Sequence, residues 1–360
     1  MTRKPVARPS DLLADPFGER GPLQRLPPMD LLGARFSFES RSTEMLGLAT
    51  LAFGALPPHR LSARIPRLTV ALLVQPANPK TRRTSLEPAP LHMQSGAGYL
   101  IGATHSSNFV CLSPAGRMGV VAIAPPMLRF PYHTRYESIE FAVFTLAARC
   151  QGLISLHAAC VSLKGRAILL MGPSGAGKST VTLHCLLHGF DMVSEDSVFV
   201  DPRTMRATGL ANFLHVTAES LRWVTRARDV AAIRKSPVIR RRSGVKKFEV
   251  DLRRGPYRLA PSPPSVAAVV FLSPEAAVGG ALLTPLSTSD RLAQCIDAQA
   301  YAASLPTWPL FERNLAKIDA FVLRRGAHPR DSVEALAAIL ESTRNSARQR
   351  SPTTRLKVCR

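Results

Sequence analysis

The sequence predicts an α/β protein, and three observations lead to this expectation. Residues 158–200 have the pattern of strand, glycine-rich loop, helix and strand, in that order. Residues 35–131 instead hold short apolar runs separated by proline and glycine, which is typical of a small sheet-rich domain. Apolar runs such as 68–74 and 266–272 suit buried strands, because they are far shorter than the roughly 20 residues of a membrane-spanning helix. We therefore expect an α/β domain preceded by a smaller sheet-rich α+β domain, and no membrane partner.

Length and composition restrict the class of protein. At 360 residues the chain has room for two domains of ordinary size. Hydrophobic residues make up 46% and charged residues 20%, which excludes a wholly disordered chain. The N-terminal residues lack the apolar stretch of a secretory signal peptide, so a cytoplasmic location is expected. The six cysteines form no C-x-x-C pair, so neither a zinc knuckle nor a dithiol redox motif is predicted.

Changes in composition divide the chain into four predicted parts. They are a loosely ordered arm at 1–34, a sheet-rich domain at 35–134, a second domain with C-terminal helices at 135–343, and a disordered basic tail at 344–360. The first domain is expected to hold a weakly predicted helix near 47–56 and strands at ARFSFES, RLTVALLV, AGYLIGAT, SNFVCLS and GVVAIAP. This domain carries no chemical motif.

The second domain is predicted as an ordered series of elements. It begins with a helix over 136–150, two strands at 158–163 and 167–171 joined by a Lys164-Gly165 turn, and a helix that stops at Gly189. A single strand is expected over 192–200 and a buried strand over 266–272. Helices are expected after Thr217 and Ser289, over 310–323, and from Asp331.

A complete phosphate-loop motif lies between the second strand and the first helix of this series. Residues 172–179, GPSGAGKS, match the Walker A pattern G-x-x-x-x-G-K-[ST]. Glycines allow successive backbone N–H groups to face phosphate oxygens, Lys178 would reach the β- and γ-phosphates, and the Ser179 hydroxyl would bind Mg²⁺. A chance glycine-rich turn is the alternative, but the flanking strand and helix favour a site for ATP and Mg²⁺. The predicted nucleotide-binding residues are Gly172, Pro173, Ser174, Gly175, Ala176, Gly177, Lys178, Ser179 and Thr180.

Two acids follow the loop closely. The chain lacks the signature of a transporter ATPase and the [NT]-K-x-D motif of a GTPase, but Glu195 and Asp196 lie in the next predicted strand. One carboxylate can hold a metal ion, and the other can accept the proton of a hydroxyl nucleophile. Because neighbouring residues of a strand point to opposite faces, only one of the two acids can face the phosphates unless a bulge intervenes.

These residues together resemble the HPr kinase/phosphorylase family, which is related in fold to phosphoenolpyruvate carboxykinase. The features that carry the resemblance are His157 before the loop, the loop itself, a short helix ending at Gly189, and the paired acids Glu195 and Asp196. The resemblance implies an α/β P-loop kinase domain preceded by a smaller sheet-rich α+β domain.

The resemblance also implies roles for four residues. Lys178 would neutralise phosphate charge, Ser179 and Asp196 would hold Mg²⁺, and Glu195 would act as the base. His157 would contact the reacting phosphate or tune the carboxylate. Considered without the resemblance, His157 is expected to be an ordinary strand histidine that is hydrogen-bonded in the core.

Two departures from the family pattern narrow the expected activity. The first acid is Glu195 where the family has Asp, and the E-x-R-G segment of the family is absent, so phosphorolysis is not expected. The expectation is an ATP- and Mg²⁺-dependent kinase that phosphorylates a serine hydroxyl of a peptide or small protein. Two alternatives stay open: a kinase for a small-molecule hydroxyl, and a nucleotide-gated module that binds an acidic or nucleic-acid partner.

Nearly half of the net charge of +22 lies in about a tenth of the chain. Residues 222–258 hold thirteen bases against three acids, a net charge of +10. Aromatic residues are few there, so a platform for stacking single-stranded nucleic acid is poorly supplied, and nucleic acid is the second choice of partner. In a kinase this segment would close over the triphosphate, with Arg242 or Lys246 stabilising the transferred charge, or it would dock an acidic peptide. A solvated loop or a contact within a homo-oligomer is the alternative.

A pair of histidines on the predicted helix completes the candidate residues. His184 and His188 are four residues apart, as in some metal sites, but the sequence offers no third ligand nearby. Packing or solvent-facing histidines are therefore expected.

Overall fold

The computed structural model describes residues 22–75, 88–105 and 108–349. The chain divides into two compact units. Unit 1 consists of Met1–Met29, Arg35–Gly54 and Arg67–Leu146, and unit 2 of Asp30–Ala34, Ala55–Pro66 and Ala147–Arg360. Residues 1–21 of the predicted arm and 350–360 of the predicted tail lie outside the described residues. No helix among the described residues is both long enough and apolar enough to cross a membrane.

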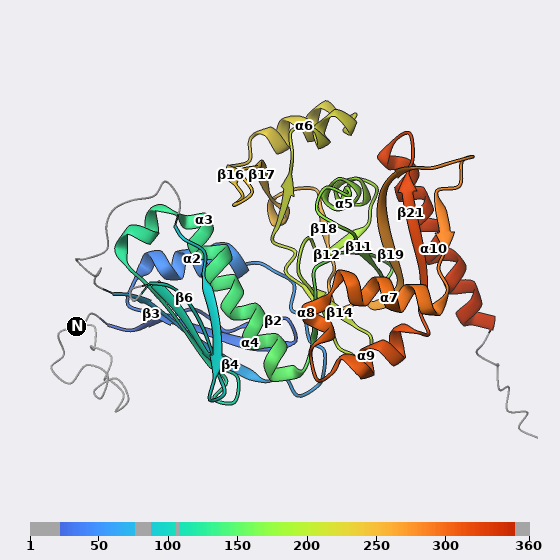
Figure 1. The fold of residues 1–360 in the computed structure, drawn as a ribbon. Coiled ribbons are helices and arrows are strands. Elements are labelled where there is room, and N and C mark those ends of the chain that lie inside the picture. The colour runs from blue at the N-terminus through green and yellow to red at the C-terminus, as the bar shows by residue number, and fades with distance from the viewer. Residues whose placement is uncertain (1–21, 76–87, 106–107, 350–360) are drawn as a thin grey trace, which may run out of the picture. The chain divides into compact units, whose positions relative to one another are not determined.

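Unit 1 is built on one sheet of mixed direction (Figure 1). The strand order is β1-β3-β4-β8-β7-β6-β5, and β2 pairs with β3. The parallel pairs are β3 with β4 and β4 with β8, whereas β5 to β8 form an antiparallel meander. The strands are β1 Gln24–Arg25, β2 Met29–Leu31, β3 Ala34–Ser40, β4 Arg67–Val74, β5 His92–Gly96, β6 Tyr99–His105, β7 Asn108–Ser113 and β8 Met118–Ile123. The predicted strands of this half are thus present, and β1 and β2 lie within the predicted arm.

The weakly predicted helix of the first half is α2, Thr43–Phe53. It begins earlier than expected because the Ser42 side chain caps it and accepts a hydrogen bond from the Met45 N–H at 3.3 Å. Gly47 lies on its exposed face and does not interrupt it, and Phe53 stacks on Phe38 of β3 at 5.1 Å between ring centroids. The remaining helical segments are η1 Pro125–Arg129, α3 Pro131–His133, the π-helical η2 Thr134–Glu140, and α4 Phe141–Gln151.

Unit 2 centres on a seven-stranded sheet with helices on both faces (Figure 1). The strand order is β18-β12-β10-β11-β19-β21-β20. Its strands are β10 Ala159–Leu163, β11 Arg166–Met171, β12 Asp191–Ser194, β18 Arg258–Leu259, β19 Ser265–Ala276, β20 Leu283–Pro285 and β21 Asp319–Arg325. Lys164 and Gly165 both have positive φ, 53° and 75°, as the predicted two-residue hairpin turn between β10 and β11 requires.

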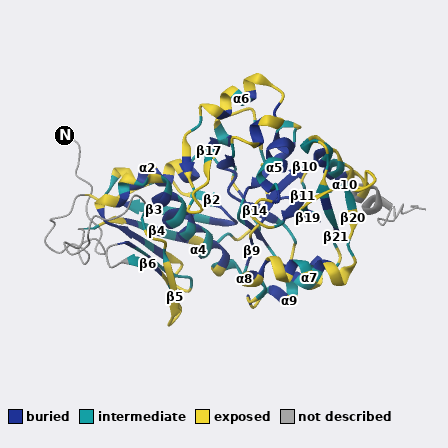
Figure 2. Cartoon of the chain, turned by 45° about the horizontal axis from the view of Figure 1, so that its top comes forward, coloured by how far each residue is buried: buried dark blue, intermediate teal, exposed yellow. Residues whose placement is uncertain are grey.

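The central strands are buried on both faces, which explains their continuous apolar runs (Figure 2). On one face, Ile168 and Leu170 of β11 pack with α5 Lys178–Leu187 and α10 Pro329–Gln349. On the other face, Leu169 and Met171 pack with α7 Thr288–Ala298, α8 Ala300–Ala303 and α9 Trp308–Leu315. The result is a helix–sheet–helix arrangement with one core on each side of the sheet.

Two small antiparallel sheets complete unit 2. One has the order β14-β13-β9 and the other β15-β17-β16. Their strands are β9 Ile154–Leu156, β13 Val198–Val200, β14 Ala207–Gly209, β15 Phe213–Val216, β16 Val238–Arg240 and β17 Lys246–Asp251. The connecting helices are η3 Ser220–Trp223, α6 Ala227–Arg234 and η4 Leu252–Arg254.

The helix predicted over 310–323 is wrong in its second half. α9 ends at Leu315, and the chain then enters the sheet as β21, parallel to β19. Apolar residues at 311, 315, 318 and 322 fit a helical period, but the consecutive apolar residues 320–323 suit a buried strand, and β19 offers them a ladder of backbone partners. At the other end of the unit, α10 runs to Gln349, so residues 344–349 are helical where a disordered tail was expected.

The single strand predicted over 192–200 is also wrong. The chain forms β12 up to Ser194, bends at Glu195 and Asp196, and resumes as β13 at Val198. The two halves belong to different sheets, β12 to the seven-stranded sheet and β13 to the sheet with β9 and β14. The Ser194 hydroxyl donates to the Ser197 carbonyl at 2.7 Å and closes this bend, which we call the β12–β13 break.

Gly209 provides a test of how tightly this break is packed. A Cβ at Gly209 would lie 2.3 Å from the Ser194 Cβ and 2.9 Å from the Val193 carbonyl oxygen. Gly209→Ala is expected to lower the free energy of unfolding by roughly 1–3 kcal/mol, as overpacked cores do. Urea unfolding followed by circular dichroism measures this. Gly47→Ala, at an exposed helical position with nothing within 4 Å, is the control and should cause no loss; equal behaviour of the two variants would contradict the packing argument.

Candidate functional site

The glycine-rich loop joins β11 to α5, as the motif requires. Gly172, Gly175 and Gly177 have φ values of 150°, 86° and 96°, a region that side chains other than glycine rarely enter. A Cβ at Gly172 would also lie 3.0 Å from the Leu272 carbonyl oxygen of β19. The backbone can therefore curl directly after the buried strand, and α5 presents its N-terminal N–H groups to the loop.

Lys178 and the two residues after it begin α5. The Lys178 ammonium folds over the loop and donates to the carbonyl oxygens of Gly172 at 2.5 Å and Pro173 at 3.3 Å. Burial lowers the pKa of Lys178 and Lys247 adds to this effect, whereas Asp196 and Glu195 oppose it. The Thr180 hydroxyl shares a hydrogen bond with Ser220 at 2.8 Å, so its side chain is engaged by η3.

Glu195 lies at the β12–β13 break and faces the loop. Its Oε1 accepts a hydrogen bond from the Ser179 hydroxyl at 2.9 Å. Its Oε2 lies 2.6 Å from Nδ1 of His215 and accepts from the His215 backbone N–H at 3.2 Å. Burial raises the pKa of Glu195, but the charge and hydrogen bond of His215, with Arg241 and Lys247, outweigh it and lower the pKa to about 2. Glu195 is thus a fixed, ionised carboxylate.

His215 is the residue of this site that sequence reasoning missed. It is 4% exposed, and its Nε2 lies 3.3 Å from Oε1 of Glu249, directly opposite on β17. Each ring nitrogen thus faces a carboxylate oxygen, which favours the protonated ring, while Nη2 of Arg241 also lies 3.2 Å from Nδ1. Burial lowers the pKa of His215 and so does the charge of Arg241, but Glu195 and Glu249 together raise it. His215 stands 20 residues from Glu195 in a segment without a motif, so no local signal marks it.

Asp196 lies in a different environment from Glu195. Its side chain is 29% exposed, with Oδ1 3.2 Å from Nδ1 of His157 and Oδ2 3.6 Å from Nη1 of Arg241. The structure thus brings together His157 and Asp196 on the open side of the site, and Ser179 and Glu195 on the buried side. The opposite-face restriction expected for two neighbours in a strand does not apply, because the break removes both acids from the strand.

Gln299 is a second residue of the site that the sequence did not indicate, and it binds the main chain of His157. The Gln299 amide, between α7 and α8, accepts from the His157 N–H at 2.8 Å and donates to the His157 carbonyl at 3.0 Å. Gln299 is 6% exposed, and its amide satisfies both backbone groups as a neighbouring strand would. The position of the largely exposed His157 ring beside Asp196 therefore depends on a helix junction far along the chain.

Strand alternation selects which bases of the basic segment face the site. His215 pairs with Glu249, and Lys247 shares their face of β17 because it lies two residues before Glu249. Lys246 points the other way and is exposed. Arg241, partly buried, contacts Asp196, whereas Arg242 is exposed. The structure therefore places Arg241 and Lys247 beside the acids, where the sequence pointed to Arg242 and Lys246.

The histidine pair of α5 has a third neighbour that the sequence did not indicate. The His328 ring meets His184 edge-on at 5.5 Å, and Trp223 meets His328 at 5.4 Å. These residues line a cavity of about 380 Å³. Within residues 22–75, 88–105 and 108–349, no group of three or more His, Cys, Asp or Glu side chains is arranged to hold a metal ion. The expected packing role of His184 agrees with its burial, 2% exposed.

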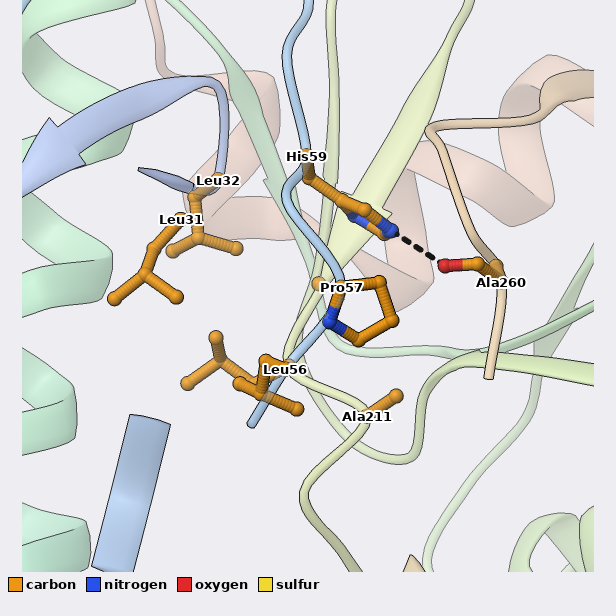
Figure 3. Close-up of a pocket in the computed structure, with 9 residues that line it drawn as sticks. Leu31, Leu32, Leu56, Pro57, His59, Ala211 and Ala260 are labelled. Carbon is orange, nitrogen blue, oxygen red and sulfur yellow. Dashed lines mark hydrogen bonds between the residues drawn. The ribbon is translucent and has the colours of Figure 1, made fainter. Parts of the chain in front are cut away.

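Unit 2 has a second, much smaller cavity, which is part of its packing (Figure 3). It measures only about 10 Å³ and is lined by Leu31, Leu32, Leu56 and Pro57 among others. His59 closes it: Nε2 donates to the Ala260 carbonyl at 2.9 Å, so Nδ1 accepts from the Thr208 hydroxyl at 2.8 Å. The hollow holds at most one water molecule, and His59 fastens residues 55–66 within unit 2.

The fold and the site define a mixed α/β protein with a glycine-rich loop between a buried strand and a helix, and with two carboxylates beside that loop. No family model matches the chain, and no curated protein matches it. Among solved structures, the HPr(Ser) kinase/phosphatase from Coxiella burnetii is similar at 12% sequence identity with a TM-score of 0.25, covering 54% of this chain and 98% of that chain.

Removal of His215 tests the buried ion pairs. His215→Leu would leave Glu195 and Glu249 buried without their shared cation, so we expect a loss of about 3 kcal/mol in the free energy of unfolding. The double variant His215→Leu/Glu249→Leu should lose less than the sum of the two single variants. Urea unfolding followed by tryptophan fluorescence measures this, because Trp223 and Trp308 both lie in unit 2. Strictly additive losses would show that the three side chains do not act as a unit.

His184 predicts a pH dependence of stability. Burial, with the charges of His328 and His188, lowers its pKa to about 4 from the ordinary 6.5. Asp229, Arg226 and Arg330 line the same cavity. A lowered pKa means that folding favours the neutral ring. The contribution of His184 to the free energy of unfolding is therefore complete above pH 6.5. As the pH falls toward 4 this contribution is lost, and the free energy of unfolding drops by up to roughly 3 kcal/mol.

Urea unfolding at several pH values, compared with His184→Gln, isolates this contribution. The variant should show a shallower loss of stability between pH 6.5 and pH 4 than the wild type. His92→Gln, at an exposed histidine of β5, is the control. Parallel curves for wild type and His184→Gln would contradict the assignment.

Proposed function

We propose that the chain is an ATP- and Mg²⁺-dependent phosphotransferase that moves the γ-phosphoryl group to a hydroxyl, with a serine of a peptide or small protein as the acceptor. One observation carries this proposal. Two carboxylates of the β12–β13 break lie near the loop in unlike environments: Glu195 is buried against Ser179, and Asp196 is partly exposed beside His157. The charge of Asp196 also opposes the lowering of the Lys178 pKa by burial. Phosphoryl transfer to a hydroxyl needs both kinds of carboxylate, one for the metal and one for the nucleophile.

Ser179 and Glu195 fit a magnesium site. Their oxygens lie 2.9 Å apart at the start of α5, and Mg²⁺ prefers hydroxyl and carboxylate oxygens and takes few of its ligands from the protein. When bound, Mg²⁺ would neutralise charge on the β- and γ-phosphate oxygens. The pairing of Glu195 with His215 keeps this carboxylate ionised and fixed in orientation, which suits a ligand and makes it a weak base.

Asp196 is the better candidate for the base. Its carboxylate is open to solvent in part and has His157 and Arg241 at its two oxygens. In this proposal Asp196 accepts the proton of the acceptor hydroxyl, His157 orients Asp196, and Lys178 leaves the loop carbonyls to bind phosphate oxygens. The roles that the resemblance implied for Glu195 and Asp196 are thereby exchanged, because Ser179 contacts Glu195 and His157 contacts Asp196.

Transfer of label from γ-labelled ATP to a panel of serine peptides and small hydroxyl compounds tests the proposal. Asp196→Asn is expected to lower kcat by about 10²–10⁴, as loss of a general base does, with nucleotide binding retained. Glu195→Gln is expected to raise the Mg²⁺ concentration needed for half-maximal activity, and Lys178→Ala to abolish nucleotide binding with the fold intact by circular dichroism.

Three outcomes would contradict parts of this scheme. Full activity of Asp196→Asn, together with a Glu195→Gln variant whose kcat falls by about 10²–10⁴ at an unchanged Mg²⁺ requirement, would restore the roles that the resemblance implied. Transfer of label to small hydroxyl compounds but not to peptides would show that the acceptor is a small molecule. ATP binding without transfer to any acceptor would contradict the phosphotransferase.

A further inference from the structure

The cavity of about 380 Å³ beside His184 has no part in the proposed phosphoryl transfer. We call it the His184 cavity. It lies between the C-terminal end of α5, the segment from η3 to α6, and the start of α10. Its volume falls within the range of roughly 300–1,000 Å³ that is typical of sites for small molecules. The cavity therefore has room for a small ligand.

One wall of the His184 cavity carries a buried polar atom that lacks a partner. The His184 side chain lines the cavity and is 2% exposed, and its Nε2 has no hydrogen-bond partner among the residues that the structure describes. Burial, with the charges of His328 and His188, lowers the pKa of His184 to about 4, so the ring is neutral at neutral pH and Nε2 either donates or accepts. An unsatisfied buried polar atom costs free energy, and a ligand in the cavity would supply its partner.

The neighbouring histidines have defined hydrogen-bonding roles. The Arg330 backbone N–H donates to Nδ1 of His328 at 3.0 Å, so Nε2 of His328 carries the ring proton and is a donor. Nδ1 of His188 donates to the His184 carbonyl at 2.7 Å, so Nε2 of the neutral His188 ring is an acceptor. The Asp229 carboxylate is a further acceptor in the lining. The side chains around the cavity thus include both donors and acceptors.

Aromatic rings supply much of the apolar lining. Trp223 is 38% exposed, so part of its indole remains accessible. Its ring meets His328 edge-on at 5.4 Å between centroids, and His328 meets His184 edge-on at 5.5 Å. Leu187 and Val224 add aliphatic surface. Because aromatic rings favour edge-on and offset-stacked contacts with one another, a further flat ring would pack well in this cavity.

The charges around the cavity narrow the class of ligand. Arg226 and Arg330 line it, but so does Asp229, and Glu334 accepts a hydrogen bond from Arg330 at 3.1 Å. A simple anion or a simple cation would therefore meet charges of both signs. A purely apolar ligand would leave Nε2 of His184 without a partner. A flat, neutral ring with donors and acceptors along its edge avoids both difficulties.

We propose that the His184 cavity binds a nucleobase or a closely similar heteroaromatic ring, whose edge forms a hydrogen bond with Nε2 of His184 and which packs against Trp223. The ring nitrogens of a nucleobase accept hydrogen bonds and its amino or amide groups donate them, so such a ring complements either neutral form of His184. The inference goes beyond the proposed function, because binding of the ring needs no phosphoryl transfer.

Two sources of such a ring are compatible with the place of the cavity in unit 2. α5 begins at the glycine-rich loop and ends at the cavity, and between them the Thr180 hydroxyl shares a hydrogen bond with Ser220 of η3 at 2.8 Å. The base of a nucleotide held by the loop would have to extend past this contact, whereas a separate nucleobase or nucleoside would not. Competition with ATP distinguishes the two sources.

Isothermal titration calorimetry of the full chain with adenine and with indole tests the proposal. Indole is also a flat bicyclic ring but has no acceptor nitrogen, so adenine should bind roughly tenfold more tightly. Adenine should also quench tryptophan fluorescence. The quenching should vanish in Trp223→Phe and persist in Trp308→Phe, because Trp308 is 5% exposed and packs in the core on the other face of the sheet.

Two variants test the lining, and a third is the control. His184→Leu replaces the polar ring by a buried apolar side chain, so the Kd for adenine should rise about tenfold while the Kd for indole stays the same. Thr225→Phe, at an exposed position of the lining, should fill the cavity and weaken both ligands. His92→Leu, at an exposed histidine of β5, should change neither Kd. Circular dichroism verifies that each variant is folded.

The source of the ring follows from titrations with ATP. Displacement of adenine by ATP, together with weaker ATP binding by His184→Leu, would identify the ring as the base of the nucleotide in the loop. Unchanged adenine binding to protein saturated with ATP would identify a separate nucleobase or nucleoside. Either result supports the cavity as a site for a nucleobase.

Other results would overturn the inference. They are an absence of saturable adenine binding, equal affinities for adenine and indole, a Kd for adenine that is the same in His184→Leu, and tighter binding of benzoate, which would indicate a site for anions. Because adenine carries no phosphate, its binding is independent of the phosphotransferase proposal. Adenine binding without label transfer would contradict only the phosphotransferase, and label transfer without adenine binding would contradict only the cavity site.

Discussion

The geometry of the site depends on one change of sheet. The chain leaves the seven-stranded sheet after β12 and enters the sheet of β9 and β14 as β13, and the Ser194–Ser197 hydrogen bond closes the turn between them. A continuous strand would send Glu195 and Asp196 to opposite faces. Because the two residues lie in the bend instead, Glu195 reaches Ser179 at the start of α5 while Asp196 meets His157 and Arg241 nearby. Gly209 is packed so closely against Ser194 that no larger residue fits without displacement.

The second constraint is the burial of charge beside the loop. A carboxylate as deeply buried as Glu195 would be protonated if it had only apolar neighbours. His215 reverses this, and Glu249 in turn stabilises the His215 charge, so the pair acts through a chain of hydrogen bonds rather than through one contact. Asp196, only one residue away, is balanced by His157 and Arg241 at the surface. The β12–β13 break thus holds two neighbouring carboxylates in different environments: Glu195 is buried beside His215, and Asp196 is partly exposed.

Local signals in the sequence predicted the local parts of this arrangement. The Lys164-Gly165 turn, the strands around it, the loop and the end of α5 just before Gly189 depend on residues close together in the chain, and all are present. The β12–β13 break, β21, His215 and Gln299 depend on partners far away in the sequence. The apolar run of β21 continues a helical spacing that begins in α9, and only its pairing with β19 identifies it as a strand. Gln299 belongs to no motif, because it binds the backbone of His157 from far along the chain.

The same distinction explains the basic segment. Composition alone places thirteen bases near the loop but cannot separate those that face the acids from those that face solvent. The register of β15 with β17 does so, because pairing His215 with Glu249 turns Lys247 inward and Lys246 outward. A shift of the register by one residue would exchange the two sets. The few acids of the segment therefore have more effect than their number suggests, because the pairing of Glu249 with His215 belongs to the register in which Lys247 faces the site and Lys246 faces solvent.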